Sequence, residues 1–334
     1  MQCIGQAAGR SALISRHAVA CITWRHCSSH AREMLPQIAS LADTRGVLRL
    51  SGQGLVAFLQ GLLTNDTKQL EAKDVRMQYA AILNSHGRYL HDLFLHKQKG
   101  DDLVLLADVD KHGATDLVKL LNRYKLRAKV DIADVSSEYT TWARFGPGLL
   151  SQGEWHSDPR LQALGQRIVL QAQDKPTSPE GEQETEGIQY KAWRIEHGVA
   201  EGDTEMPSGH AIPLEYNLDG LNAISFSKGC YVGQELIARS HFRGVIRKRL
   251  MPVDIAGDEE PKIGTSILAP GRKRPAGSLQ AAQKGRGLAC LNLQAALAAA
   301  EGNEHLELGE GGPQVTPWRP TWWPKDWGEE PAAS

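Results

Sequence analysis

Hydrophobic residues change their spacing along the chain, and the changes predict alternating strands and helices. Residues 44–51 alternate between apolar and polar side chains, which is typical of a half-buried strand. Residues 53–63 instead place leucine and phenylalanine at helical spacing, and the polar triplet Thr64-Asn65-Asp66 follows them. The sequence therefore predicts a strand and then a short helix that ends at this triplet.

The next part of the chain has the pattern of a hairpin followed by a helix between strands. Residues 79–83 form an apolar run, 84–87 have the composition of a hairpin turn, and 89–96 return as the second strand. This region is predicted to continue with a strand, an amphipathic helix and another strand, over 103–106, 109–123 and 128–132. Strands mixed with helices in this order indicate an α+β body.

The middle of the chain is more polar and less regular. Residues 171–187 are rich in acidic residues, proline and glycine, and we expect a linker there. Apolar positions over 188–197 predict a helix, for which Gly198 is a suitable C-terminal cap. Residues 199–227 follow no single period and are expected to be mostly irregular.

The C-terminal part changes character at Gly244. Short strand patterns separated by glycine and proline turns predict a small β-barrel from there onward. Cys290 lies in an apolar run and is expected in the core of that barrel. The tail from Trp318 to Trp327 contains four tryptophans and two prolines, and we expect it to pack as a strap on the body.

Composition limits the class of protein. The chain has 334 residues, enough for two domains, and no stretch reaches the roughly 18 uncharged apolar residues of a membrane helix. Residues 1–32 contain four arginines, several serines and no acidic residue, which is typical of an organellar transit peptide. The alternative is a disordered tail. Without that segment the chain has 34 basic and 39 acidic residues, which argues against a dedicated nucleic-acid-binding protein.

The cysteines fall into two groups, one in the expected transit peptide and one in the rest of the chain. Cys3, Cys21 and Cys27 lie in the expected transit peptide, and only Cys230 and Cys290 remain beyond it. Two cysteines are too few for a disulfide framework or for an autonomous metal site. An iron–sulfur cluster normally takes about four thiolate ligands, so a partner would have to supply the others.

The octapeptide Lys-Gly-Cys-Tyr-Val-Gly-Gln-Glu, residues 228–235, is the most distinctive stretch of the chain. Glycines near a thiol let a ligand or a partner backbone approach closely, and a helix is expected to begin at 234–239. The alternative is an inert buried cysteine, which is the usual fate of a free cysteine. The polar, glycine-rich setting favours a functional loop whose candidate residues are Lys228, Gly229, Cys230, Tyr231, Gly233, Gln234 and Glu235.

This octapeptide resembles the signature of the YgfZ family, whose members are relatives of the glycine-cleavage aminomethyltransferase, or T-protein. The mitochondrial members are iron–sulfur cluster assembly factors of the Iba/Caf type. The resemblance runs from about residue 40 to the C-terminus. Four further stretches are similar to family motifs and occur in the expected order, at 58–66, 83–93, 194–198 and 212–219.

The resemblance implies a fold and a location. The expected fold is α+β and T-protein-like, with two intertwined α+β subdomains around a central cavity and a C-terminal β-barrel. On this basis 1–34 are a mitochondrial transit peptide, 35–243 the folate-binding-like domain and 244–334 the barrel with its tryptophan-rich tail. The expected compartment is the mitochondrial matrix.

The resemblance also implies a function with little or no turnover. The chain is expected to assist the maturation of mitochondrial [4Fe-4S] proteins together with A-type carrier proteins, and Cys230 is the expected ligand of a shared [2Fe-2S] cluster. A basic run at Arg243, Arg247, Lys248 and Arg249 is either a solvated strand edge or a partner-docking or anion site. Neither a membrane nor a nucleic acid is an expected partner.

Tetrahydrofolate is the second expected ligand, because the family shares the T-protein fold. The resemblance assigns it to Glu196, in the Arg-x-Glu-x-Gly motif, together with Asn65, Asp92 and Arg194. A tetrahydrofolate-dependent aminomethyl or one-carbon transferase is the main alternative function. It is disfavoured because T-proteins carry two adjacent aspartates where this chain has His91-Asp92. A thiol redox protein is a further alternative, although no resolving cysteine lies near Cys230 in sequence.

Overall fold

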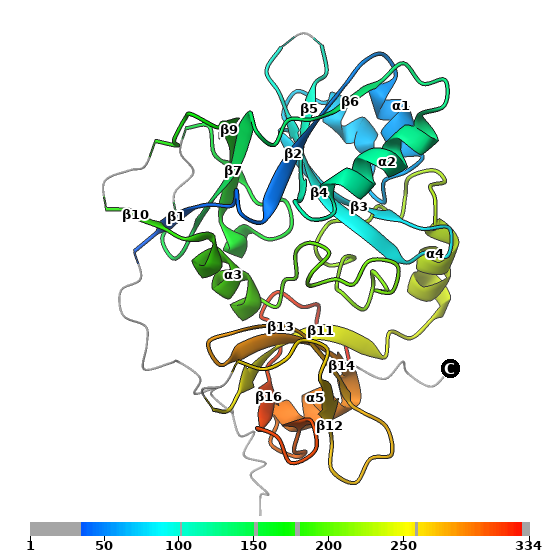
Figure 1. The fold of residues 1–334 in the computed structure, drawn as a ribbon. Coiled ribbons are helices and arrows are strands. Elements are labelled where there is room, and N and C mark those ends of the chain that lie inside the picture. Colours follow the sequence, from blue (N-terminus) through cyan, green and yellow to red (C-terminus); the bar gives the residue numbers. More distant parts are fainter. Residues whose placement is uncertain (1–34, 101, 150–152, 178–180, 258–259, 329–334) are drawn as a thin grey trace, which may run out of the picture. The chain divides into compact units, whose positions relative to one another are not determined.

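The computed structural model describes residues 35–100, 102–149, 153–177, 181–257 and 260–328 (Figure 1). The expected transit peptide, 1–34, lies outside the described residues. Among the described helices, none is both long and apolar enough to cross a membrane.

The first sheet contains the strands that alternation predicts in the first part of the chain. Its strands are all antiparallel, in the order β3-β4-β5-β2-β6. Helices α1 and α2 bury their leucines against one face of it. The strands are β2 (Arg45–Ser51), β3 (Met77–Leu83), β4 (Tyr89–Lys97), β5 (Leu105–Asp110) and β6 (Asp131–Asp134), and the helical segments are α1 (Leu55–Gln60), η1 (Thr67–Glu71) and α2 (Ala114–Lys125).

The predicted boundaries over 103–132 are wrong by several residues. Strand β5 continues to Asp110, where a strand ending at 106 and a helix from 109 are expected from the pattern. Asp108 is compatible with a buried strand because the guanidinium Nε of Arg45 lies 2.6 Å from its Oδ1 atom. Asp110 then accepts a hydrogen bond from the backbone N–H of His112, which closes a turn before α2 begins. The polar residues after 106 predict the end of the strand. The strand continues because their carboxylates are buried and paired.

The second sheet has the order β10-β1-β7-β9-β8, in which β1 and β10 are parallel and the other neighbours antiparallel. The chain begins in this sheet, passes through the whole first sheet and returns, so the two subdomains are intertwined as expected. The predicted linker 171–187 is wrong in part, because β10 pairs there with β1. The elements are β1 (Gln37–Ser40), β7 (Tyr139–Phe145), β8 (His156–Ser157), η2 (Gln162–Leu164), β9 (Gln166–Gln171) and β10 (Gln183–Thr185).

Helix α3 (Gly187–Glu196) and the irregular segment after it confirm the patterns of the middle region. Gly198 has a φ of 72°, and its N–H donates to the carbonyl of Ile195. Residues 199–227 form turns, yet Leu214 and Leu218 from this segment are completely buried. They belong to a core that also contains side chains of β3, β4 and the C-terminal barrel. One hydrophobic core therefore joins the α+β body to the barrel.

The C-terminal sheet confirms the predicted barrel. Its order is β15-β12-β13-β14-β11-β16, and a bridge between Glu307 and Gln314 nearly closes it. Cys290, on β14, is buried as expected. Helix α4 (Gln234–Arg243) precedes this region, whose elements are β11 (Lys248–Ile255), β12 (Ser266–Leu268), β13 (Gly277–Gln283), β14 (Arg286–Asn292), α5 (Leu293–Ala300), β15 (Glu307–Leu308) and β16 (Val315–Pro317).

The tryptophan-rich tail packs as a strap, as the sequence predicts. Trp323 is buried in the barrel core, and the indole N–H of Trp322 donates to the carbonyl of His197. The guanidinium of Arg249 lies 3.2 Å from the ring centroid of Trp327 and also forms paired hydrogen bonds to Asp219. Arg249 is therefore buried, and the prediction of a solvated strand edge is wrong for this residue.

Candidate functional site

Lys228, the first residue of the octapeptide, is an anchor for the loop that follows it. Its side chain is buried, and its ammonium donates hydrogen bonds of 2.7–2.8 Å to the carbonyls of Gln60, Leu63 and Asn65. These carbonyls lie at and just beyond the C-terminal end of α1, where helical carbonyls lack partners within the helix. Burial lowers the pKa of Lys228 to about 8, an effect that nearby Asp66 partly offsets. One charged side chain thus ties the octapeptide to the first sheet's helical layer.

Tyr231 and Val232 hold the other side of the loop. The Tyr231 ring is buried, and its centroid lies 5.1 Å from the Lys228 ammonium. The backbone N–H of Val232 donates to the carbonyl of Gly61. Burial also raises the pKa of the Tyr231 hydroxyl to about 12, so this side chain stays neutral in its pocket. The loop is therefore fixed on both sides of Cys230.

Gly233 sets the start of α4 against the hairpin turn of the first sheet. Its φ is 83°, a conformation that favours glycine, and a Cβ atom there would lie 2.4 Å from the carbonyl oxygen of Asn84. Gly87, in the same turn, is equally constrained by Leu236 of α4. Gln234 and Glu235 form the first turn of the helix. The hairpin and octapeptide motifs are thus in direct contact.

Cys230 is the exposed point of this fixed loop. Its side chain is open to solvent, and a Cβ atom added at neighbouring Gly229 would have no atom within 4 Å. The arrangement leaves room for a second molecule to reach the Cys230 sulfur. It confirms the expectation of an accessible thiol and excludes the inert, buried alternative for this cysteine.

Alkylation should distinguish Cys230 from Cys290, the two cysteines among the described residues, by their reactivity. Iodoacetamide at pH 8 is expected to modify Cys230 and to leave Cys290 unmodified in the folded protein. Burial, with a smaller contribution from Glu215, raises the pKa of the Cys290 thiol to about 12, and the thiolate is the reactive form. Peptide mass spectrometry with and without denaturant measures both sites. Equal labelling of the two cysteines in the folded protein would contradict this assignment.

The surface beside Cys230 is apolar and positively charged. Phe242 and Val245 are 66 % and 56 % exposed. The His241 ring stacks on Phe226 at a centroid distance of 3.7 Å, so His241 belongs to this aromatic group. Within the described residues, no ion-pair partner faces the exposed side chains of Arg239, Arg243 and Arg247. We call this surface, from Cys230 through α4 to Arg247, the α4 face.

A buried ionic cluster lies between the two sheets, where the family resemblance implies a central cavity. Glu201 is at its centre, and its two carboxylate oxygens lie 2.8 and 2.9 Å from the guanidinium groups of Arg160 and Arg167. Burial alone would raise the pKa of Glu201, but the surrounding arginines hold it well below its ordinary value. The other charged members are Arg45, Asp92, Asp108, Asp158, Arg194 and Glu205.

The four residues expected to bind folate do not converge on one cavity. Asp92 is completely buried and contacts the hydroxyls of Tyr79 and Tyr89. Arg194 pairs with Glu205, and the Asn65 amide donates to the carbonyls of Tyr79 and Asn222. Glu196 is exposed and pairs with Arg286 of β14. The residues present therefore do not fit a common folate pocket, and folate binding stays a prediction of the resemblance.

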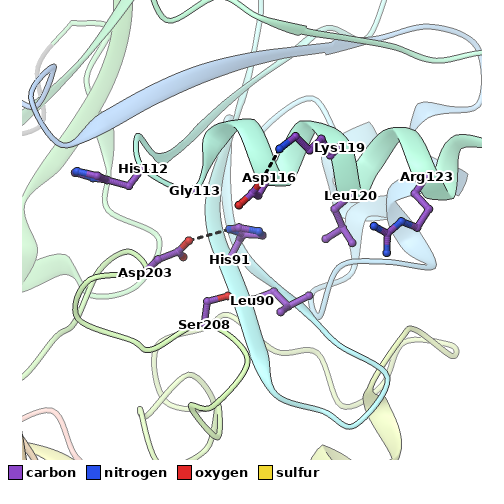
Figure 2. A pocket seen from close by; sticks show the side chains of 10 residues that line it. All are labelled: Leu90, His91, His112, Gly113, Asp116, Lys119, Leu120, Arg123, Asp203 and Ser208. Carbon is purple, nitrogen blue, oxygen red and sulfur yellow. Dashed lines mark hydrogen bonds and ion pairs between the residues drawn. The ribbon is translucent and has the colours of Figure 1, made fainter. Parts of the chain in front are cut away.

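His91 differs from its neighbour Asp92, which is completely buried, because the His91 ring lies at an open cavity. This cavity lies between β4, the start of α2 and the segment 203–208 (Figure 2). The ring Nδ1 of His91 lies 3.1 Å from Oδ2 of Asp203. Adjacent residues of β4 thus face opposite environments, with Asp92 in the ionic cluster and His91 at the cavity wall.

Comparison with known proteins gives consistent answers for the barrel and for the whole chain. Residues 247–325 match the family described as CAF17, C-terminal beta-barrel domain. The chain is 34 % identical to the mitochondrial iron–sulfur cluster assembly factor IBA57 homolog of Mycosarcoma maydis, over 84 % of each chain. It is 33 % identical to the mitochondrial IBA57 of Mus musculus, again over 84 % of each chain.

The chain belongs to the IBA57 family. The names of these relatives place the family in mitochondria and describe it as iron–sulfur cluster assembly factors, which confirms both expectations at that level. A solved structure of the glycine cleavage system aminomethyltransferase T from Bartonella henselae superimposes with a TM-score of 0.64 over 86 % of each chain, at 13 % identity. That likeness confirms the T-protein fold for this IBA57-family chain.

Sequence reasoning missed Glu201, Asp203 and Tyr89, which organise the interior of this IBA57-family chain. One signal was available, since β2 begins with Arg45 and β9 contains Arg167, each next to apolar strand residues. Buried arginines require carboxylate partners, and the acidic stretch Glu201-Gly202-Asp203-Thr204-Glu205 was the unassigned source of such partners. Which carboxylate meets which arginine depends on the fold and could not be derived from spacing.

Proposed function

We propose that this chain assists the assembly of mitochondrial iron–sulfur proteins in the matrix by presenting the Cys230 sulfur to a [2Fe-2S] cluster held by an A-type carrier protein. The observation that carries the proposal is an exposed thiol on a loop fixed by the Lys228 ammonium and the buried Tyr231 ring. A prepositioned thiolate loses little conformational freedom when it binds iron. Thiolate is also a preferred ligand of iron–sulfur clusters.

The number of cysteines supports a shared cluster. Beyond the expected transit peptide the sequence contains only Cys230 and Cys290, and Cys290 is buried in the barrel. A cluster with about four protein ligands therefore needs further thiolates from another protein if Cys230 binds it. The cluster is cargo in this proposal, and the chain contributes one ligand and a surface.

The α4 face supplies the surface against which the carrier would dock. Exposed Phe242 and Val245 offer an apolar centre, and Arg239, Arg243 and Arg247 surround it with positive charge. Charge complementarity accelerates association and fixes orientation, whereas buried aromatic contacts contribute most of the affinity. The carrier surface that fits is apolar with an acidic rim. This arrangement develops the docking alternative for Arg243 and Arg247.

The proposal is tested by mixing the purified chain anaerobically with a cluster-loaded A-type carrier. The wild type is expected to co-elute with the carrier in a complex that retains the visible absorption of the cluster. Cys230→Ser should reduce the coloured complex at least about tenfold, because it replaces the thiolate ligand. Cys290→Ala is the matched control and should keep the colour. Identical spectra and co-elution for the wild type and Cys230→Ser would refute the proposed ligand.

A further inference from the structure

The cavity beside His91 has features of a ligand site that the cluster proposal does not use. Its volume is about 420 Å³, and its lining comes from three separate segments of the chain (Figure 2). Leu90 and Leu120 contribute apolar surface, whereas Lys119 and Arg123 lie along the same side of α2. Cavities of this size that combine apolar walls with a few polar groups are typical of small-molecule sites.

Counting hydrogen-bond donors helps to place the protons of the Tyr89, Asp92 and Asp203 side chains beside this cavity. The Tyr89 oxygen lies 3.0 Å from Oδ1 of Asp92 and 3.0 Å from Oδ1 of Asp203. A hydroxyl has one proton, so one of the two contacts requires a proton on a carboxyl group. Burial raises the pKa of Asp92, although Arg45 partly offsets the effect. Burial thus favours Asp92 as the carboxyl that holds the extra proton, which leaves the Tyr89 proton for the contact with Asp203.

This assignment fixes the orientation of the His91 ring. Asp203 accepts from Tyr89 at one oxygen, so its other oxygen is placed to accept a proton from Nδ1 of His91. In the Nδ1–H tautomer the lone pair of the ring lies on Nε2, which is left free of this contact. Gly113 permits the arrangement, because a Cβ atom there would lie 2.3 Å from Oδ2 of Asp203 and 3.0 Å from Nδ1 of His91.

The cavity favours a ligand that both donates a hydrogen bond and carries negative charge. In the Nδ1–H tautomer, Nε2 of His91 is an acceptor in the part of the cavity that Leu90 and Leu120 also line. Lys119 is paired with Asp116 at 3.0 Å. Arg123, however, has no ion-pair partner among the residues that the structure describes. Its guanidinium is therefore available for a carboxylate or a phosphate.

We infer that the cavity between β4, α2 and segment 203–208 is a binding site for a small oxyacid with an apolar body. In this site His91 Nε2 accepts the ligand's hydrogen bond and Arg123 binds its negative charge. Asp203 and Tyr89 are positioning residues that hold the ring in the accepting tautomer. The shared ligand chemistry is an ionised acid that also carries a hydroxyl donor, which a hydroxylated carboxylic acid or phosphate monoester would supply.

The test is an NMR titration of the full chain labelled with ¹⁵N, including the histidine rings. 4-Hydroxybenzoate and 4-hydroxyphenyl phosphate are the two acidic probes, since each combines a hydroxyl donor with a negative charge, and 4-hydroxybenzamide is the neutral comparison. At least one acid is expected to shift the signals of the His91 ring and of Gly113 saturably, and the neutral amide is not. Comparison of the two acids distinguishes a carboxylate site from a phosphate site. The ring spectrum without a probe should show the Nδ1–H tautomer.

Two surface variants make the test independent of folding defects. Arg123→Gln is expected to weaken the bound acid by about fivefold or more, as for the loss of one charged contact near the surface. Arg127→Gln changes an exposed arginine just beyond α2, outside the cavity, and should alter binding less than about twofold. The inference is overturned if neither acid gives saturable shifts, if the neutral 4-hydroxybenzamide binds as well as the acids, or if both variants have the same effect.

Discussion

Glu201→Gln is expected to lower the free energy of unfolding by about 3–5 kcal/mol, the loss typical of breaking a buried ion pair. The substitution keeps the size of the side chain but removes a negative charge that contacts four buried guanidinium groups. Arg160 and Arg167 contact it at 2.8–2.9 Å, and Arg45 and Arg194 lie within 3.9 Å. Their positive charges would remain in the interior without this counter-charge. Urea unfolding followed by circular dichroism measures the difference.

Glu196→Gln is the matched control for this prediction. It makes the same chemical change on an exposed residue whose partner, Arg286, is partly exposed. Surface ion pairs contribute at most about 1 kcal/mol, so this variant should unfold close to the wild type. A loss of stability in Glu201→Gln that did not exceed the loss in Glu196→Gln would show that the interior cluster is not a source of stability. With that result, stability would not explain why the charged cluster occupies the space between the two sheets.

Lys228→Met is expected to cost about 2–4 kcal/mol and to free the Cys230 loop from its fixed position, since charged hydrogen bonds contribute about 1.5–3 kcal/mol each and not additively. Methionine keeps the length of the stem but leaves three carbonyl oxygens, of Gln60, Leu63 and Asn65, without their donor. Complex formation with the cluster-loaded carrier should fall even in the folded fraction, because the thiol is no longer preorganised. Denaturant unfolding and the yield of coloured complex measure the two effects.

Lys73→Met is the control for the loss of a lysine charge, because the Lys73 side chain is exposed. It should change stability by less than about 0.5 kcal/mol, as surface substitutions usually do. If Lys228→Met matched this control in both stability and complex yield, the ammonium would not be the anchor of the loop. The presence of a lysine at this position in the octapeptide would then need another explanation.

Local chemistry explains which elements could be predicted from sequence. The β3–β4 hairpin was predictable because its turn residues and the alternating strands beside it both specify the same structure. The shape of the barrel could be inferred from its glycine and proline turns, and the burial of Cys290 from its apolar neighbours. Strand β10 could not, because three polar residues form a strand only through pairing with distant β1. The intertwining of the two sheets came from the resemblance alone.

The exposed cysteine of the candidate site was predictable from sequence, but the contacts that hold the surrounding residues in place were not. The exposure of Cys230 follows from the polar, glycine-rich sequence around it. The role of Lys228 depends on carbonyls near α1, and that of Asp203 depends on His91 and Tyr89 in β4. Such contacts join segments far apart in sequence. For the same reason the expected folate residues could be named from a motif, but their separation in space could not.

The central claim is that the Cys230 sulfur binds iron in the complex with the carrier. Replacing Cys230 by selenocysteine and recording the selenium X-ray absorption fine structure of the coloured complex tests this bond directly. We expect an iron atom in the first shell of the selenium, present with the cluster-loaded carrier and absent with the apo carrier. A coloured, co-eluting complex in which selenium has carbon as its only neighbour would contradict the account.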